Sequence, residues 1–103
     1  MPTKAHSQDD NLHELADIFR LLGDPNRLKI VVACMDDEIS VGDIAEKTEL
    51  SQPLVSHHLR LLKAARLVKH EKQGKQAFYT LSDDHIRCVL QDMLTHINEP
   101  KDD

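Results

Sequence analysis

The spacing of apolar residues changes once along this chain, near residue 66, and that change limits the folds the chain can adopt. Before it, apolar residues recur every three to four positions, which is typical of amphipathic helices. After it, two short stretches flank a glycine-containing turn, which indicates a β-hairpin. The pattern predicts helices at about 11–22, 25–35, 40–48, 51–65 and 84–98, with strands at 67–72 and 76–81 around the turn Gln73-Gly74-Lys75.

Capping residues place the starts of three helices. Asp24 and Ser51 each precede a proline in the first helical turn, and Ser40 precedes the amphipathic stretch 41–48. Side chains of Ser and Asp accept hydrogen bonds from the backbone N–H groups that a helix start leaves free, and proline is tolerated in the first turn. The third and fourth helices are therefore joined by a turn of about three residues.

Two helices joined by such a turn and followed by a hairpin predict a winged helix-turn-helix, mainly α with a β-hairpin wing. We expect one domain at 10–100, a flexible tail at 1–9 and a short tail at 101–103. A domain this small buries only roughly 60–65% of its unfolded surface. Because a second copy would bury more, we expect a homodimer formed through the N- and C-terminal helices.

The composition argues against a membrane or secreted protein. The longest purely apolar run, at 30–35, has six residues, whereas a membrane helix needs about 20. The opening sequence MPTKAHSQDD lacks the apolar stretch of a signal peptide, and two cysteines are too few for a disulfide framework. These observations predict a cytoplasmic protein with no membrane partner.

The charge of the chain is unevenly distributed. The net charge is −5, but residues 51–81 carry six basic side chains and one acidic, net +5. A local basic patch, rather than the global charge, is what meets phosphate. Aromatic residues are scarce (Phe19, Phe78 and Tyr79), and recognition of RNA or single strands by stacking needs more of them. The sequence therefore favours double-stranded DNA as a partner.

The helix at 51–65 has two faces. Val55, Leu59 and Leu62 form the apolar one, and the other is polar. The N-terminus of a recognition helix enters the major groove, where short polar side chains reach base edges and cations further along hold phosphates. We expect base contacts from Gln52, Ser56 and His57, and phosphate contacts from Arg60 and Lys63 on the helix and from Lys69, Lys72 and Lys75 on the wing.

Two histidines of the last helix belong to a pattern, Asp83-x-His85 and His96-x-x-Glu99. His85 and His96 are eleven positions apart, so both project from the same helix face but lie ~16.5 Å apart along the axis. Zinc holds its ligand atoms at ~2.0–2.2 Å, so one helix cannot bring both ends to one ion. Residues two apart on a helix point ~200° apart, so Asp83 must cap the helix from outside if it is to share an ion with His85.

Two antiparallel copies of this helix can bring the ends together. Asp83 and His85 of one chain then face His96 and Glu99 of the other, which gives two identical sites per dimer. Two imidazoles and two carboxylates suit Zn(II), and Co(II) or Ni(II) less well. The pattern predicts metal sites that span the dimer interface.

Several stretches resemble the ArsR/SmtB family of bacterial metal-sensing repressors, over roughly residues 10–100. They are FRLLGDPNRLKIV (19–31), SVGDIAEKTELSQPLVSHHLRLLKAARLV (40–68), GKQAFYTL (74–81) and the final Asp83-x-His85…His96-x-x-Glu99. The last motif looks like the zinc site that the family places on its dimerising helices. The segment LSQPLVSHHLRLLK is the most specific part of the resemblance.

The resemblance implies a homodimer that binds a palindromic operator, represses metal-efflux or metal-storage genes and releases DNA when zinc binds. It also implies a contact from His96 to a backbone carbonyl near Arg66. Members that sense cadmium, lead or arsenic carry Cys-x-Cys where this chain has Ser40 and Gly42, so the resemblance favours zinc over those metals. Pro53 stands where the family usually has a small polar residue.

Other functions are also compatible with parts of the sequence. Persulfide-sensing relatives keep a redox cysteine pair in the helices that here hold Cys34 and Cys88, although buried structural cysteines fit the positions better. A metal buffer without DNA function is a further alternative. His6 and His13 can add ligands to a second site, or can simply be surface histidines. An enzyme is disfavoured, because the chain has no phosphate-binding loop, zinc-protease motif or nucleophile elbow.

Overall fold

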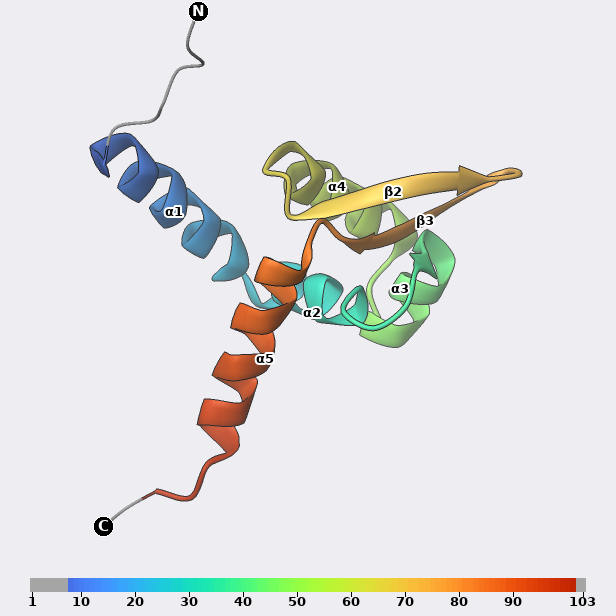
Figure 1. The fold of residues 1–103 in the computed structure, drawn as a ribbon. Helices are drawn as coiled ribbons and strands as arrows, with labels where there is room; N and C mark the ends of the chain where they lie inside the picture. Colours follow the sequence, from blue (N-terminus) through green and yellow to red (C-terminus); the bar gives the residue numbers. More distant parts are fainter. Residues whose placement is uncertain (1–7, 102–103) are drawn as a thin grey trace, which may run out of the picture.

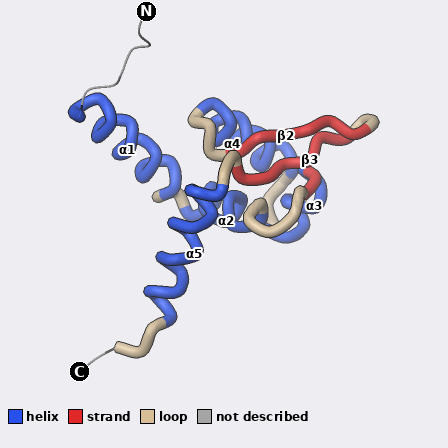
Figure 2. The backbone as a smooth tube through the Cα atoms, viewed as in Figure 1, coloured by secondary structure: helices blue, strands red, loops and turns tan. Residues whose placement is uncertain are grey.

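The computed structural model describes residues 8–101 and shows a helical body from which one hairpin and two helices project (Figures 1 and 2). Three helices make the body: α2 (Pro25–Ala33), α3 (Val41–Thr48) and α4 (Gln52–Ala64). The first helix α1 (Gln8–Leu22) and the last helix α5 (Asp84–Asn98) extend away from it in different directions (Figure 1). Within the described residues, no helix is long and apolar enough to cross a bilayer.

The helix starts follow the predicted caps. The Asp24 carboxylate accepts hydrogen bonds from the backbone N–H groups of Asn26 and Arg27, at 2.9 and 3.0 Å. Ser40 and Ser51 cap α3 and α4 through their hydroxyl oxygens. The turn between α3 and α4 passes through Glu49, whose φ of 61° is left-handed. The helix-turn-helix unit is thus confirmed.

The wing is part of a small sheet that the sequence did not fully reveal. β2 (Val68–Gln73) and β3 (Gln76–Leu81) form the predicted hairpin, but its turn contains only Gly74 and Lys75, because Gln73 pairs with Gln76. Gly74 has a φ of 65°, which glycine adopts without strain. A third strand, β1 (Ile39–Ser40), pairs antiparallel with β3, giving the order β1-β3-β2.

The core lies between α2, α3, α4 and the base of the sheet. Its fully buried side chains include Ile30, Ile44 and Val55, together with the predicted Leu59 and Leu62 on the inner face of α4. The first and last helices contribute no buried residue, although Ile18, Leu21, Ile86 and Leu90 pack against the core from them. The core of the body therefore forms within one chain without buried residues from α1 or α5.

Several local expectations were wrong. α1 begins at Gln8, so Gln8 and Asp9 belong to a helix rather than to the tail, whereas residues 1–7 with His6 lie outside the described range. α2 ends at Ala33 because Cys34 leaves helical geometry. The three-to-four spacing of apolar residues in this helix predicts an inward face made of Leu28, Val31, Val32 and Met35. Leu28 and Val32 are instead 37% and 40% exposed. The α2 helix turns Ile30 and Val31 to the core instead.

Candidate nucleic-acid interface and metal-binding helix

The polar face of α4 is exposed along its whole length. Gln52, Ser56 and His57 lie near its N-terminus, and Arg60 and Lys63 follow on later turns, all with exposed side chains. The buried Val55, Leu59 and Leu62 on the opposite side fix this orientation, because α4 can turn only one face to the core. The predicted base-contacting and phosphate-contacting residues of α4 therefore share one solvent-facing surface.

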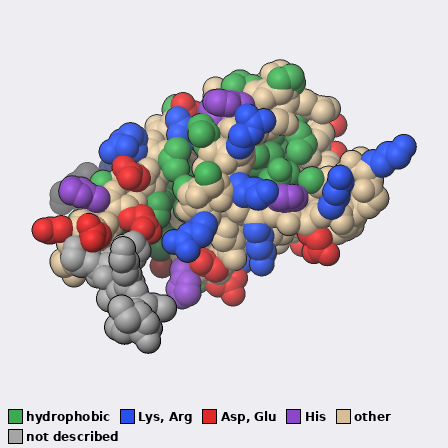
Figure 3. Space-filling view, turned by 90° about the horizontal axis from the view of Figure 1, so that it is seen from above, with side chains coloured by type: hydrophobic (Ala, Val, Ile, Leu, Met, Phe, Trp, Pro, Cys, Tyr) green, Lys and Arg blue, Asp and Glu red, His purple; other side chains and the backbone are tan. Residues whose placement is uncertain are grey.

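The wing carries its cations beside this face. Lys69 and Lys72 project from β2 and Lys75 occupies the turn, and all three are exposed. Viewed from above, lysine and arginine side chains spread across one face of the molecule out to the hairpin tip (Figure 3). Gln73 Nε2 donates to the Glu38 carboxylate at 3.0 Å, which fixes the outer part of β2 to the loop before β1.

His70 is a candidate contact that sequence reasoning missed. It is exposed on β2, and its ring stacks on that of Tyr79 across the hairpin with centroids 5.3 Å apart. In β2, side chains two positions apart share a face, so His70 lies on the same side of the wing as Lys72. The signal that identifies His70 as a candidate contact is the register of the two strands, which pairs His70 with Tyr79.

His58 is the residue of α4 whose position was least expected. It is only 8% exposed, and its Nδ1 atom is buried without a hydrogen-bond partner among the described residues. Burial lowers the pKa of His58, the Asp24 carboxylate opposes that effect, and the neighbouring Arg27 and His57 add to it. His58 therefore joins α4 to the start of α2 and takes no part in the exposed polar face.

The N-terminal end of α5 brings Asp83 and His85 together. Asp83 has an extended backbone (φ −158°, ψ 174°) and caps the helix by accepting a hydrogen bond from Ile86 N–H at 3.1 Å. Its Oδ1 atom lies 3.6 Å from His85 Nδ1. The expectation that Asp83 lies outside the regular helix is confirmed, and this placement is what allows the two side chains to approach each other.

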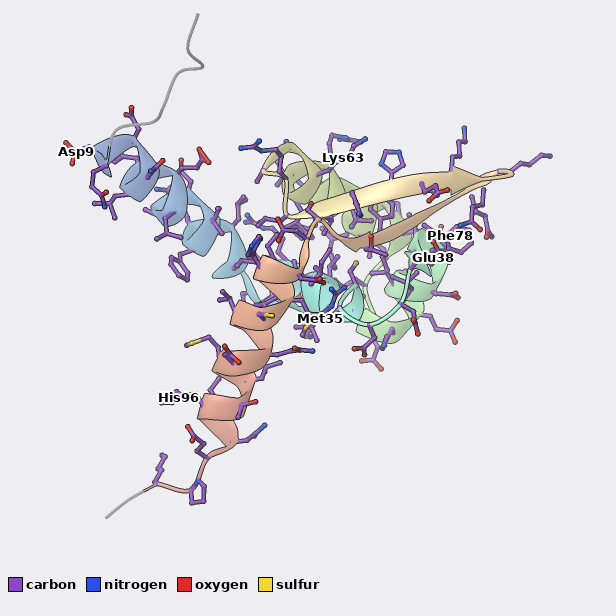
Figure 4. The ribbon with its side chains drawn as sticks, in the orientation of Figure 1. Asp9, Met35, Glu38, Lys63, Phe78 and His96 are labelled. Atoms are coloured by element: carbon purple, nitrogen blue, oxygen red, sulfur yellow. The ribbon has the colours of Figure 1, made fainter. Side chains whose placement is uncertain are left out.

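The C-terminal end of α5 holds a second pair. His96 Nδ1 lies 3.4 Å from the Oε1 atom of Glu99, which follows the last helical residue. The side chains of His85 and His96 are 96% and 74% exposed, so both are accessible to a ligand. Figure 4 shows His96 near the outer end of α5, far from the body that carries Lys63. Each end therefore offers one imidazole and one carboxylate.

The described part of one chain does not complete a metal site. Among residues 8–101, no group of three or more His, Cys, Asp or Glu side chains is arranged to hold an ion. Two pairs of nitrogen and oxygen donors at opposite ends of a helix match half of a tetrahedral site each. The donor set fits zinc only if a second chain supplies the other half.

Apolar side chains lie between and beside the two pairs. On α5, Val89, Met93, Leu94 and Ile97 are 43–70% exposed, and on α1, Leu12, Leu15 and Phe19 are 46–60% exposed. Ile86 and Leu90 continue the α5 stripe inward and pack against the core. An apolar stripe of this kind on two projecting helices marks an interaction surface.

The two cysteines differ in environment. Cys34 is fully buried, and burial raises the pKa of its thiol to about 12, with a smaller opposing effect of Lys47. Cys88 is exposed on α5, so the expectation of a buried structural cysteine is confirmed for Cys34 and wrong for Cys88. A thiol with a raised pKa is a poor nucleophile, because the thiolate is the reactive form.

Known proteins provide an independent comparison. Residues 24–70 match the profile described as "Bacterial regulatory protein, arsR family". A transcriptional repressor SmtB homolog of Synechocystis is 34% identical over 90 residues, covering 87% of this chain and 68% of that protein. A cadmium resistance transcriptional regulatory protein CadC homolog of Staphylococcus aureus is 37% identical, covering 86% of this chain and 74% of that protein.

A solved structure shares the fold. The homodimeric winged helix-turn-helix DNA-binding domain of a possible ArsR-family regulator from Mycobacterium bovis superposes with a TM-score of 0.79. The match covers 100% of this chain and 98% of that one, at 21% sequence identity, so it supports the fold alone. The sequence relatives are regulators of transcription rather than enzymes. The chain belongs to the arsR family of bacterial regulatory proteins.

Proposed function

We propose that this protein is a metal-responsive repressor that binds palindromic operator DNA as a homodimer and releases it when Zn(II) binds between the subunits. Co(II) and Ni(II) are less well suited alternatives. The observation that carries the proposal is the pairing of Asp83 with His85 at one end of α5 and of His96 with Glu99 at the other, at 3.6 and 3.4 Å.

The apolar stripe of α5 supports an antiparallel dimer. Val89, Met93 and Ile97 are 54–70% exposed in the single chain, and fully burying an exposed side chain of this size contributes up to about 1.5–3 kcal/mol. When two copies of α5 run in opposite directions, the N-terminal pair of one lies beside the C-terminal pair of the other. Twofold symmetry then produces two equivalent sites.

Four side chains would hold each ion: Asp83 and His85 from one subunit, and His96 and Glu99 from its partner. Zinc would supply a crosslink between the subunits, with no redox chemistry of its own. This set of ligands favours zinc over soft metals, because two imidazoles and two carboxylates without a thiolate are poor ligands for soft metals. Ser40 and Gly42, at the start of α3, likewise offer no thiolate.

The exposed face of α4 and the wing would read the operator. Gln52, Ser56 and His57 are placed to reach base edges at the N-terminal end of the recognition helix. Arg60 and Lys63, with Lys69, Lys72 and Lys75 on the wing, would hold phosphates. In a twofold dimer, the two recognition helices must lie about 34–36 Å apart to enter successive major grooves.

The coupling between the two sites would run through the end of α4. As the family resemblance implies, His96 would donate the N–H of its free ring nitrogen to a backbone carbonyl near Arg66, which lies just beyond α4 and has a left-handed φ of 61°. Because His96 lies far from the body of its own chain (Figure 4), this carbonyl would belong to the partner subunit. Ligation would fix the imidazole and favour a dimer whose recognition helices are wrongly spaced. Allosteric couplings are typically about 1–3 kcal/mol, and stronger derepression needs a larger difference in affinity.

A titration of the operator-bound dimer with Zn(II), Co(II), Ni(II) and Cd(II) tests the proposal. We expect two zinc ions per dimer and release of DNA, with Cd(II) the least effective. A monomeric protein, or one zinc ion per dimer, would contradict the intersubunit sites. Binding to a palindromic duplex that weakens steeply with salt separates a DNA-binding regulator from a metal buffer.

The alternative of redox sensing through Cys34 and Cys88 is less well supported. Cys34 is fully buried in the core and the pKa of its thiol is raised to about 12, so it lacks the low-pKa, accessible character of a redox sensor. Replacing both cysteines with Ser should leave zinc-linked DNA release intact.

A further inference from the structure

A hollow of about 710 Å³ lies where α1, the α4–β2 turn, β2 and the start of α5 meet. Its charged and imidazole lining consists of three cations, Lys63, Arg66 and Lys69, the imidazoles of His70 and His85, and the carboxylates of Glu14 and Asp83. Its apolar lining includes Ile18 and Ile86, which pack against the core. The hollow thus has a positive rim over an apolar base.

Little of this positive charge is neutralised within the chain. Arg66 approaches the Glu14 carboxylate at 3.8 Å, but both side chains are at least half exposed, so the pair is weak. Lys63 and Lys69 form no ion pair with any described residue and remain available. The hollow also includes Asp83 and His85, so its rim coincides with one of the two metal half-sites.

We propose that this hollow receives the acidic segment 99–103 of the partner subunit, which lies over Lys63 and Lys69 and competes with DNA phosphate for them. The inference rests on the proposed function, because it requires the antiparallel α5 dimer. In that dimer, the partner subunit's Glu99 lies at the rim, next to Asp83 and His85. The segment that follows Glu99 would then start at the rim of the hollow.

Reach and chemistry both favour this occupant. Four extended residues span up to about 13 Å, and Lys63 and Lys69 line the same hollow as Asp83 and His85. Pro100 and the 70% exposed Ile97 offer apolar surface to Ile18 and Ile86. Asp102 and Asp103 offer two carboxylates to Lys63 and Lys69. Attachment of the segment to a helix that is already docked raises its effective concentration at the hollow.

The contact would link metal binding to DNA affinity by electrostatics. Lys63 and Lys69 are also expected phosphate contacts, and a lysine covered by a carboxylate releases fewer counterions when DNA binds. The segment is tethered most closely when the partner subunit's His96 and Glu99 are fixed beside Asp83 and His85. Metal binding would then weaken DNA affinity in part by placing a competitor on the interface.

The test uses the full chain with Asp102→Asn and Asp103→Asn, which leaves the four metal-ligand candidates unchanged. The matched control is Asp36→Asn with Asp37→Asn, two exposed acids in the loop after α2. In the metal-free dimer, we expect the first pair to shift the backbone amide NMR signals of residues 66–70, and the control pair to leave them in place. No shift at 66–70, in a protein that is dimeric and binds two zinc ions, would overturn this proposal and leave the proposed function intact.

DNA binding gives the second readout. At low ionic strength, the Asp102→Asn, Asp103→Asn protein should bind duplex DNA about three- to tenfold more tightly than the unchanged protein, and its affinity should fall more steeply with salt. The control should gain less than about twofold. Equal gains in the two variants would show an effect of net charge only and overturn the proposal. A monomer, or a protein without intersubunit zinc, would overturn both the proposed function and the docked segment.

Discussion

Arg87 donates a hydrogen bond from Nε to the backbone carbonyl of Met35 at 2.7 Å, across 52 positions of sequence. The bond satisfies a carbonyl just beyond the end of α2, where the helix no longer supplies a partner. It joins the first turns of α5 to the body, while the same guanidinium pairs with Asp84. The direction in which α5 leaves the body, and hence the position of its two donor pairs, depends on this contact.

Replacing Arg87 with Gln should therefore lower the free energy of unfolding by about 1–2 kcal/mol, since the bond is charge-assisted and partly buried. Urea denaturation at a fixed protein concentration measures the change, because the stability of a dimer depends on concentration. Arg20→Gln is the control: its ion pair with Asp17 is exposed, and its loss should cost less than about 0.5 kcal/mol. Equal losses would mean that the contact with Met35 contributes nothing.

His96→Asn should leave metal-free DNA binding near normal and abolish the response to zinc. The change removes one imidazole from each site but touches neither α4 nor the wing. Fluorescence anisotropy of a labelled operator, with and without zinc, measures both quantities. His13→Asn, on the exposed surface of α1, should retain the full response. If the His96 variant still releases DNA with zinc, the sensing site lies elsewhere.

The two cysteines should react at very different rates. A thiol-specific chromogenic reagent at about pH 8 should modify Cys88 in the native protein and reach Cys34 only after unfolding, because the thiolate is the reacting species. Cys34 is inaccessible, and burial raises the pKa of its thiol to about 12. Cys88→Ser should abolish the fast phase. Rapid reaction of Cys34 in that variant would instead support redox sensing through the cysteines.

Acid should weaken the fold through His58. Burial lowers the pKa of His58 below its ordinary value in the folded state, so the unfolded chain binds the proton more readily. The stabilising contribution is complete above the unfolded pKa of about 6.5 and is lost as the pH falls below it. Unfolding free energies measured between about pH 7.5 and 5 should fall more steeply for the unchanged protein than for His58→Gln. The same slope in both would place the titrating group elsewhere.

Local signals explain what the sequence could predict. Asp24, Ser40, Ser51 and Asp83 mark helix starts because each satisfies backbone N–H groups within three residues of itself. The α5 helix was predicted at its observed bounds, and the apolar spacing of α4 identified its inner face. The placement of Asp83 as a cap beside His85 also followed from helix geometry, once the two residues were taken to share an ion. The chemistry of the candidate metal site was thus predictable as two separate halves.

Long-range pairing explains what was missed. β1 has two residues, and Ile39 becomes a strand only because it meets Tyr79 forty positions later. Leu28 and Val32 fit an inward face by periodicity, which reveals where apolar residues recur but not which surface covers them. His58 carries a polar side chain at a position that the packing of α4 against α2 buries, and nothing in its neighbours along the sequence indicates that.

Glu49 before α4 and Arg66 after it both have a φ of 61°, a backbone geometry that resists gradual adjustment in residues with a β-carbon. The recognition helix α4, the DNA-reading element of the proposed function, thus lies between two residues whose backbone geometry resists change. In the proposed function, a signal from the metal would therefore leave that element intact and reorient the two DNA-reading heads as whole bodies, so repression and release would differ in the spacing of two unchanged modules.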